Sequence, residues 1–194
     1  AAHGKEVGGA DVFLFPKYAH PTATNSQIVT KADELMDYEI ELCARFDREI
    51  KSIADFNAAY KGLFVCGDFT DRADLLRLVD KDNVESGVGF TDGKSGTGRF
   101  PIGPFTVVPH DWSSFLKQIQ LTLKVNGQVR QATNANMMIK KLNGILDATF
   151  AEKDVTRWVY QQKNIPLLKD NTLYKGQSIL TGTPEGVTFR PPSK

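Results

Sequence analysis

The chain has 194 residues, of which 24 are Lys or Arg and 23 are Asp or Glu, so its formal net charge is +1. This near-neutral balance argues against nucleic acid as the main partner, because a surface that binds a duplex usually carries a basic excess. The length and the 41% share of hydrophobic residues fit one globular domain and exclude a disordered or collagen-like chain. No apolar run approaches the roughly 20 residues that cross a bilayer, so we expect no membrane partner.

The first predicted strand covers residues 38–46, where apolar and polar side chains alternate strictly. This alternation is typical of a half-buried strand, and it places Glu39 and Glu41 on the same face. A short helix is expected over residues 49–60. A second, apolar strand is then expected over residues 63–69.

Residues 70–76 are typical of the start of a second helix, which the side chain of either Thr70 or Asp68 could cap. Residues 86–104 are rich in glycine and also contain proline. We therefore expect a loop there, with at most short extended pieces.

A β-hairpin is the clearest predicted element. Apolar and polar residues alternate over residues 118–125, and Asn126-Gly127 separates this run from a second extended run over 128–133. Asn-Gly between two such runs indicates a type I′ turn.

The last third of the chain gives weaker patterns. Residues 136–150 carry apolar side chains at helical spacing and predict an amphipathic helix. Residues 151–172 give no clear assignment, and a last strand is expected over 176–181. The sequence therefore predicts a single β-rich, mixed α/β domain with short helices over residues 1–194.

Cys43 and Cys66 both lie in apolar, strand-like surroundings, and their spacing does not match a metal-binding finger. We interpret them as reduced core residues, with a disulfide as the alternative. Reduced cysteines favour the cytoplasm or, in a eukaryote, the mitochondrial matrix.

Glu39 and Glu41 form the strongest chemical signal. Residues two apart on a strand point to the same side with their Cα atoms about 6 to 7 Å apart, so two carboxylates can converge on one cation. Asp68 lies at the end of the next predicted strand, where side chains from neighbouring strands meet. Three carboxylates without His or Cys favour a hard divalent cation such as Mg²⁺ or Mn²⁺ over zinc. The alternatives to a metal site are that Glu39 and Glu41 only face solvent and that Asp68 only caps the following helix.

Two further patterns involve basic residues. Lys94 lies in a glycine-rich segment that can approach a ligand closely. Val88 stands where a phosphate-binding loop needs glycine, so we reject a nucleotide site. The spacing of His3 and Glu6 would let the carboxylate orient the imidazole as a general base, although a histidine this near a chain start can also belong to a disordered end.

Taken together, these motifs resemble those of the fumarylacetoacetate hydrolase family, in the family's order and over nearly the whole chain. The segments that carry the resemblance are Ala1–Glu6, Tyr38–Leu42, Gly67–Arg72, Lys94–Phe105, Val125–Gln131 and Thr181–Val187.

The resemblance implies a family-type β-sandwich or roll that forms a catalytic domain with short helices. Residues 1–9 would form a lid segment over its active site. Carried over onto this sequence, the family's site residues are the metal ligands Glu39, Glu41 and Asp68, the catalytic residues His3, Glu6 and Lys94, and the substrate-binding residues Arg72 and Thr183.

Three positions depart from the family pattern. Gly67 replaces an asparagine, Thr97 stands where an acidic residue is common, and Leu75 stands where a glutamine is often found. The last two departures leave the substrate undefined. The positions of the motifs near both ends also lead us to expect that flanking N-terminal residues and closing C-terminal strands are missing from this sequence.

The activity that the resemblance implies is metal-dependent hydrolysis of a C–C bond in a 2,4-dioxo acid, such as an acylpyruvate or fumarylacetoacetate. The products would be a 2-oxo acid and a second carboxylic acid. The expected cofactor is Mg²⁺, with Mn²⁺ or Ca²⁺ as alternatives, acting as a Lewis acid. The cation would push the pKa of Lys94 down toward working pH, and His3 would activate water.

Two alternatives remain open. The same metal chemistry without water would give a 2-oxo acid decarboxylase or isomerase, such as an oxaloacetate decarboxylase or a hydroxyheptadienedioate isomerase. A catalytically inactive relative would bind its ligand without turnover. The resemblance further implies a homodimer whose substrate is a small anionic 2-oxo acid.

Overall fold

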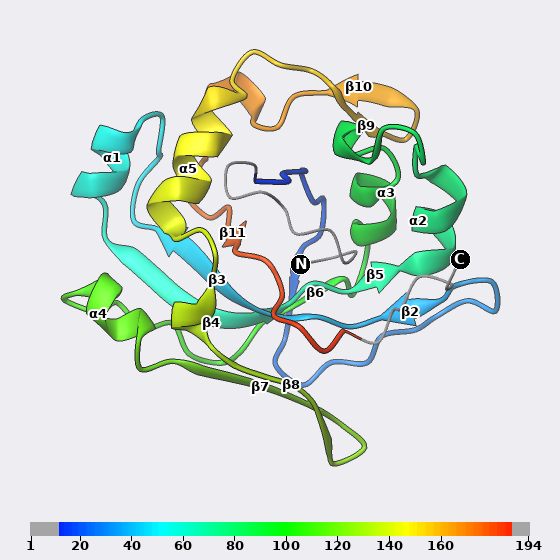
Figure 1. The fold of residues 1–194 in the computed structure, drawn as a ribbon, viewed down its shortest axis with the longest axis horizontal. Coiled ribbons are helices and arrows are strands. Elements are labelled where there is room, and N and C mark those ends of the chain that lie inside the picture. The colour runs from blue at the N-terminus through cyan, green and yellow to red at the C-terminus, as the bar shows by residue number, and fades with distance from the viewer. Residues whose placement is uncertain (1–11, 188–194) are drawn as a thin grey trace.

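The computed structural model describes residues 12–187, and it confirms a mixed α/β fold of many short strands and few short helices (Figure 1). The strands are β1 (Pro21–Thr22), β2 (Met36–Asp37), β3 (Ile40–Phe46), β4 (Lys61–Gly67), β5 (Thr70–Asp71), β6 (Phe100–Pro101), β7 (Gln120–Val125), β8 (Gln128–Asn134), β9 (Trp158–Tyr160), β10 (Lys163–Ile165) and β11 (Ile179–Leu180). The α-helices are α1 (Ile53–Ala58), α2 (Arg72–Leu78), α3 (Phe90–Lys94), α4 (Trp112–Leu116) and α5 (Leu142–Ala151). The 3₁₀ turns are η1 (Val84–Ser86), η2 (Ala135–Met137) and η3 (Lys169–Asn171).

An antiparallel sheet in the order β11-β3-β4 lies at the centre of the fold. β3 pairs with β4 along its whole length, from Ile40 opposite Gly67 to Phe46 opposite Lys61. β11 pairs with the other edge of β3 only at Cys43 and Ala44. The N-terminal end of β3 therefore needs other partners on that edge.

The predicted hairpin is confirmed as β7 and β8, and Figure 1 shows it below β3 and β4. Asn126 and Gly127 have φ angles of 51° and 80°, which are the positive values that a type I′ turn requires. β7 also contacts β3. The hairpin thus lies against the strand that carries the predicted metal ligands.

β3 is buried on both faces, which corrects the prediction of a half-buried strand. Its apolar face belongs to the main core, which joins the sheet to α1, α4, α5 and the hairpin. Its other face carries Glu41 and Cys43, which are 3% and 0% exposed. The alternation is correct, but the polar face lies against other parts of the protein and not against water.

Two helix predictions need correction. The expected loop over residues 86–104 contains α3, and α2 is capped by Asp71, whose carboxylate accepts from the N–H groups of Ala73 and Asp74. A Cβ at Gly93 would meet the Asp71 carbonyl oxygen at 2.9 Å. This glycine therefore allows the close packing of α3 on the start of α2, whereas the sequence suggested a loop.

The other predicted helices are shorter than expected, and β9, β10 and η3 lie in the segment that gave no clear pattern. Residues 49–60 form only α1, and residues 136–150 contain part of η2, a break and α5. None of the helices within residues 12–187 has the length and apolar character needed to cross a membrane.

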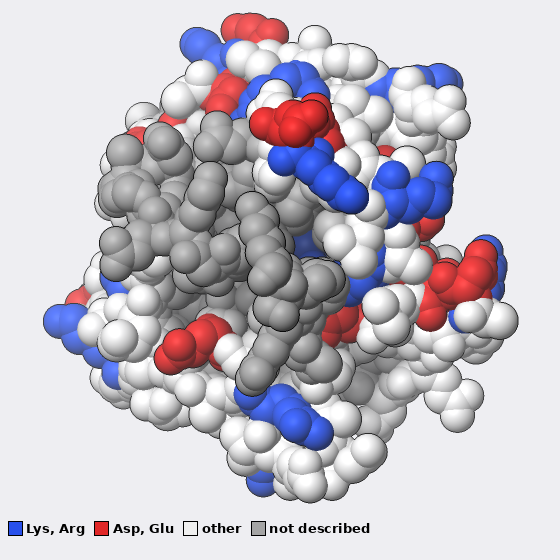
Figure 2. All heavy atoms as spheres, turned by 45° about the vertical axis from the view of Figure 1, so that its right-hand side comes forward, with Lys and Arg blue, Asp and Glu red and all other residues white. Residues whose placement is uncertain are grey.

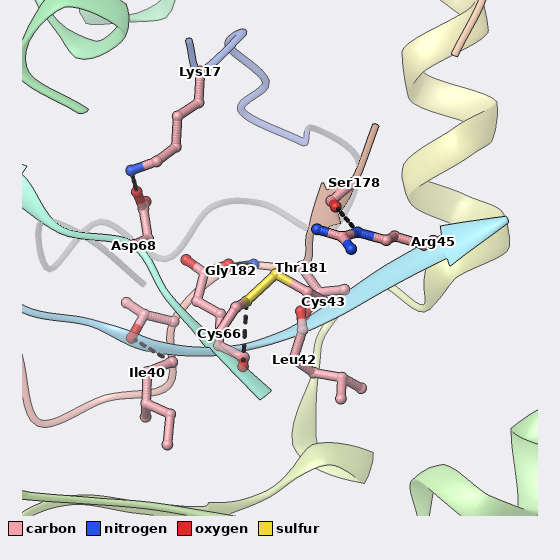
Figure 3. The surroundings of a disulfide bond; sticks show 12 residues. Lys17, Ile40, Leu42, Cys43, Arg45, Cys66, Asp68, Ser178, Thr181 and Gly182 are labelled. Atoms are coloured by element: carbon pink, nitrogen blue, oxygen red, sulfur yellow. Dashed lines mark hydrogen bonds and ion pairs between the residues drawn. A yellow bond between two sulfur atoms is a disulfide. The ribbon is translucent and has the colours of Figure 1, made fainter. Parts of the chain in front are cut away.

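Cys43 and Cys66 form a disulfide between β3 and β4, so the prediction of reduced cysteines is wrong (Figure 3). Cys43 lies opposite Phe64 and Cys66 lies opposite Glu41, so the bond runs diagonally across the strand pair with a Cα–Cα distance of 5.9 Å. The strand register creates this proximity, and register was not part of the sequence argument. Because both cysteines are in this disulfide, they no longer support the expectation of a reducing compartment.

Reduction of this disulfide should lower the free energy of unfolding by about 3 kcal/mol, because the bond closes a loop whose ends are 23 residues apart and so restricts the unfolded chain. Urea unfolding with and without a dithiol reductant measures the effect. The double variant Cys43→Ala, Cys66→Ala serves as the control, since its unfolding should not respond to the reductant. Equal midpoints for the oxidised and reduced parent protein would contradict the prediction.

Candidate functional site

Three buried carboxylates converge at the end of the central strand pair. Ligand oxygens of Glu39, Glu41 and Asp68 all lie within 4.8 Å of one another. Glu39 and Glu41 share a face because they are two residues apart. Asp68 follows directly after β4, and its N–H donates to the Glu39 carbonyl at 2.9 Å, which continues the β3–β4 pairing. The structure therefore brings together the three residues that the sequence proposed as metal ligands.

Lys94, the last residue of α3, reaches into this cluster and is only 4% exposed. Its Nζ donates to Glu39 Oε2 at 2.8 Å, to Asp68 Oδ2 and to Thr70 Oγ1 at 2.9 Å. Burial alone would lower the pKa of Lys94, but the charges of Asp68 and Glu39 raise it above its ordinary value. A neighbouring cation alone would lower the pKa of Lys94, as expected from the sequence, but the direct contacts with the two carboxylates reverse the direction.

Lys17 is a second buried cation at the site, and the sequence argument missed it. Its Nζ donates to Asp68 Oδ1 at 2.6 Å and to the Phe69 carbonyl at 3.3 Å. Burial lowers the pKa of Lys17, while the charge of Asp68 opposes this shift. The residue lies in an irregular segment, so no periodic pattern pointed to it.

Arg72, the first residue of α2, forms an ion pair with Oε1 of Glu39. Its Nη2 lies 2.7 Å from Glu39 Oε1 and 2.8 Å from Asp37 Oδ2, and its Nε donates to the same Asp37 oxygen. Asp37 is a further member of the site that the sequence argument did not identify. The guanidinium thus contacts two protein carboxylates, and it fixes the orientation of Glu39.

Glu41 differs from the other two carboxylates. Its Oε2 accepts from the Gly182 N–H at 2.8 Å, and among the described residues no ion pair reaches it. Burial, together with the charges of Asp68 and Glu39, raises the pKa of Glu41 to about 8. A further positive charge next to Glu41 would therefore relieve an unfavourable arrangement.

The chemistry and spacing of these groups fit a hard divalent cation. The donors are all carboxylate oxygens, which Mg²⁺, Mn²⁺ and Ca²⁺ prefer. An octahedral Mg²⁺ with bonds of about 2.1 Å keeps neighbouring ligand oxygens about 3 Å apart and opposite ones about 4 Å apart. The three ligand oxygens lie within 4.8 Å of one another, so movements of the side chains could bring all three to one cation.

Thr183, which the sequence proposed as a substrate ligand, uses its hydroxyl within the protein. Its Oγ1 donates to the Ile40 carbonyl at 3.1 Å and accepts from Gln131 Nε2 at 2.8 Å. In this arrangement the hydroxyl proton goes to the backbone, so the group could offer a substrate only an acceptor. Gln131 is 1% exposed and is another site residue that the sequence argument missed.

The proposed dyad of His3 and Glu6, like the lid over residues 1–9, lies outside the described residues. It therefore stays a prediction.

A cavity of about 1700 Å³ lies beside the carboxylate cluster, and its described wall includes Glu41, Asp68, Lys17 and Phe15. The Lys94 Nζ lies 5.9 Å from the centre of the Phe15 ring. On the face that Figure 2 shows, acidic and basic side chains are mixed among neutral ones. The charged side chains of the candidate site, by contrast, are buried.

Comparison with known proteins identifies the family. The model described as fumarylacetoacetate (FAA) hydrolase C-terminal matches residues 6–194. Human mitochondrial oxaloacetate tautomerase FAHD2B is 30% identical over 190 residues, which cover 92% of this chain and 50% of the relative. The chain spans about half the length of the curated relatives it matches.

Solved structures support the same fold. A putative HpcE protein from Mycobacterium smegmatis superimposes with a TM-score of 0.61 at 23% identity, covering 89% of this chain and 55% of the other. The 2-hydroxyhepta-2,4-diene-1,7-dioate isomerase from Mycobacterium marinum gives a TM-score of 0.54 at 23% identity, covering 89% and 54%. With a family model that matches almost the whole sequence, the chain belongs to the fumarylacetoacetate hydrolase family.

Proposed function

We propose that this chain forms the catalytic part of an enzyme that moves a proton at the carbon next to the 2-oxo group of a small 2-oxo acid. The reaction class is tautomerisation or isomerisation, assisted by a divalent cation. The observation that carries the proposal is the contact of Lys94 Nζ with Glu39 and Asp68, two of the three clustered carboxylates. The names of the tautomerase and isomerase relatives agree with this class.

The cation, for which we propose Mg²⁺, would be held by Glu39, Glu41 and Asp68 and would supply Lewis acidity to the 2-oxo group. Lys94 would carry the proton. In ketonisation its ammonium gives a proton to carbon 3 of the enol, and the C=C electron pair forms the new C–H bond. The enol hydroxyl proton then passes to the neutral amine, so Lys94 returns to its starting state.

The substrate is proposed to be a small anionic acid that enters the cavity beside Glu41 and Asp68. The Lys17 ammonium adds positive charge to that wall. Binding of the substrate carboxylate by Arg72 and Thr183 remains a prediction, and their present contacts indicate that both also orient the metal ligands. To donate to a carboxylate, the Thr183 hydroxyl would have to give up its hydrogen bond to the Ile40 carbonyl.

Hydrolysis of a 2,4-dioxo acid is the second candidate, and the spacing of His3 and Glu6 favours it. The two candidates share the cation and Lys94, but only hydrolysis needs an activated water. A decarboxylase would use the same groups and release CO₂.

Incubation of the protein and Mg²⁺ with oxaloacetate or acetylpyruvate separates these activities. The loss of enol absorbance measures tautomerisation, CO₂ release measures decarboxylation, and acetate formation measures hydrolysis. Because Mg²⁺ alone promotes some of these reactions, each rate is compared with a protein-free control. We expect accelerated tautomerisation. Protein that accelerates none of the three would support an inactive ligand-binding relative.

His3→Ala should lower hydrolysis of acetylpyruvate at least about a hundredfold, the usual share of a general base. The same variant should leave tautomerisation of oxaloacetate close to the parental rate. Equal hydrolysis by variant and parent would remove the general-base role from His3.

Two further proposals concern the whole protein. A homodimer is proposed, and sedimentation velocity would test it. For a eukaryotic source, the mitochondrial relatives support a mitochondrial location, and for a bacterial source the cytoplasm stays the proposal. Fractionation of the source cells would test this.

A further inference from the structure

One edge of β3 has no neighbouring strand near Glu39 and Glu41, two of the proposed metal ligands. β11 pairs with β3 at Cys43 and Ala44, and the Thr181 N–H extends this pairing to the Leu42 carbonyl at 3.1 Å. Within the described residues the backbone pairing on this edge ends there, so the backbone groups of Ile40 have no backbone partner in β11.

Two side chains take the place of the missing strand. The Ile40 N–H donates to Gln131 Oε1 at 2.9 Å, and the Ile40 carbonyl accepts from Thr183 Oγ1 at 3.1 Å. Gln131 Nε2 donates to Thr183 Oγ1 at 2.8 Å, which closes a ring of three hydrogen bonds. We call this ring of Ile40, Gln131 and Thr183 the side-chain bridge.

The side-chain bridge also holds the turn that contacts Glu41. Gln131 Nε2 donates to the Pro184 carbonyl at 3.0 Å, and the Gly182 N–H in the same turn donates to Glu41 Oε2. A Cβ at Gly186 would meet the Arg130 carbonyl at 2.6 Å, and its φ is +96°. Only glycine therefore lets the chain after the turn approach β8 so closely.

We infer that Gln131 is a positioning residue for the metal site: through the side-chain bridge it fixes the backbone between Glu39 and Glu41 and the amide that orients Glu41. This inference rests on the proposed metal-dependent function. Ile40 lies between the two glutamates, so a rotation of its peptide groups would turn both carboxylates away from Asp68. Gln131 is fully buried and comes from the hairpin, and it links three segments that are far apart in the sequence.

The experiment that tests this inference uses Gln131→Met, which keeps the length of the side chain and removes its hydrogen bonds. Partners that orient metal ligands typically account for about 10- to 100-fold in metal affinity. We therefore expect Gln131→Met to bind Mn²⁺ about 10- to 100-fold more weakly than the parent, as measured by the electron paramagnetic resonance signal of free Mn²⁺.

Thr183 supplies a second, independent pair of variants. Thr183→Val preserves the shape of the residue and breaks the same ring, so its loss of Mn²⁺ affinity should resemble that of Gln131→Met. The double variant should lose no more than either single variant, because both remove one network. Thr183→Ser retains the hydroxyl and should bind Mn²⁺ like the parent. If Gln131→Met does not fold, the Thr183 pair decides the question.

Ser52→Ala is the matched control for stability. It removes the N-cap of α1, away from the site, and should lower the thermal midpoint without changing Mn²⁺ affinity. Parental Mn²⁺ affinity in Gln131→Met and Thr183→Val would overturn the inference and leave the proposed function intact. A parent that binds Mn²⁺ without turning over any 2-oxo acid would overturn the proposed function alone, and the affinity comparison would still hold.

Discussion

Lys94→Met should slow proton transfer on oxaloacetate by between about a hundredfold and ten-thousandfold, the usual contribution of a positioned acid or base. Methionine has a similar length and cannot carry the proton. The cluster should remain folded, since Asp68 keeps its contact with Lys17 and Glu39 keeps its contact with Arg72. The loss should appear in kcat, measured at saturating Mg²⁺ from the decay of enol absorbance.

A second measurement distinguishes a loss of proton transfer from a loss of the site's structure. Lys94→Met should bind Mn²⁺ at least as tightly as the parent, because it removes a cation that competes for Glu39 and Asp68. Lys117→Met, a change at an exposed lysine, serves as the control and should react at the parental rate. If Lys94→Met kept more than about a tenth of the parental kcat, Lys94 would have no part in proton transfer.

Asp68→Asn and Glu41→Gln should differ in their effect on the free energy of unfolding of the metal-free protein, although both remove one carboxylate. Asp68 is the shared partner of Lys17 and Lys94, so Asp68→Asn leaves buried charge poorly compensated and should cost about 3 to 5 kcal/mol. Glu41 has no ion pair among the described residues and lies beside two like charges. Glu41→Gln should therefore leave the free energy of unfolding unchanged or raise it.

Both variants should lose the stabilisation that a bound cation gives the parent. Urea unfolding in EDTA gives the metal-free values, and repeating it in Mg²⁺ gives the contribution of the cation. A loss of stability in Glu41→Gln as large as that in Asp68→Asn would show that Glu41 is not the unfavourable member of the cluster. A parent that gains no stability from Mg²⁺ would argue against the metal site itself.

Local patterns in the sequence were enough for part of the fold and part of the site. Asn126-Gly127 fixes its hairpin through the backbone preferences of two adjacent residues. The spacing of Glu39 and Glu41 places both carboxylates on one face because a strand repeats every two residues. Each of these features depends on residues close together in the chain.

The parts that could not be predicted depend on contacts between distant segments. Lys17 and Asp68 are 51 positions apart, and Gln131 and Ile40 are 91 apart. The glycines in 86–104 do not indicate one structure, because a glycine can serve a turn or, like Gly93, the close packing of a helix. Which side chain caps α2 depends on the residue at which the helix begins, and the observed cap, Asp71, directly follows the expected Thr70.

The bond between Cys43 and Cys66 has a consequence for how a cation would enter the site. Cys43 is two residues from the proposed ligand Glu41 on β3, and Cys66 is two residues from Asp68, which follows β4. Figure 3 shows the disulfide together with Asp68. Oxidation therefore ties the two ligand-bearing strands together before any cation arrives, and less backbone freedom remains to be lost on binding. We therefore expect the affinity for a cation to depend on whether Cys43 and Cys66 are oxidised or reduced, although neither sulfur is a proposed ligand.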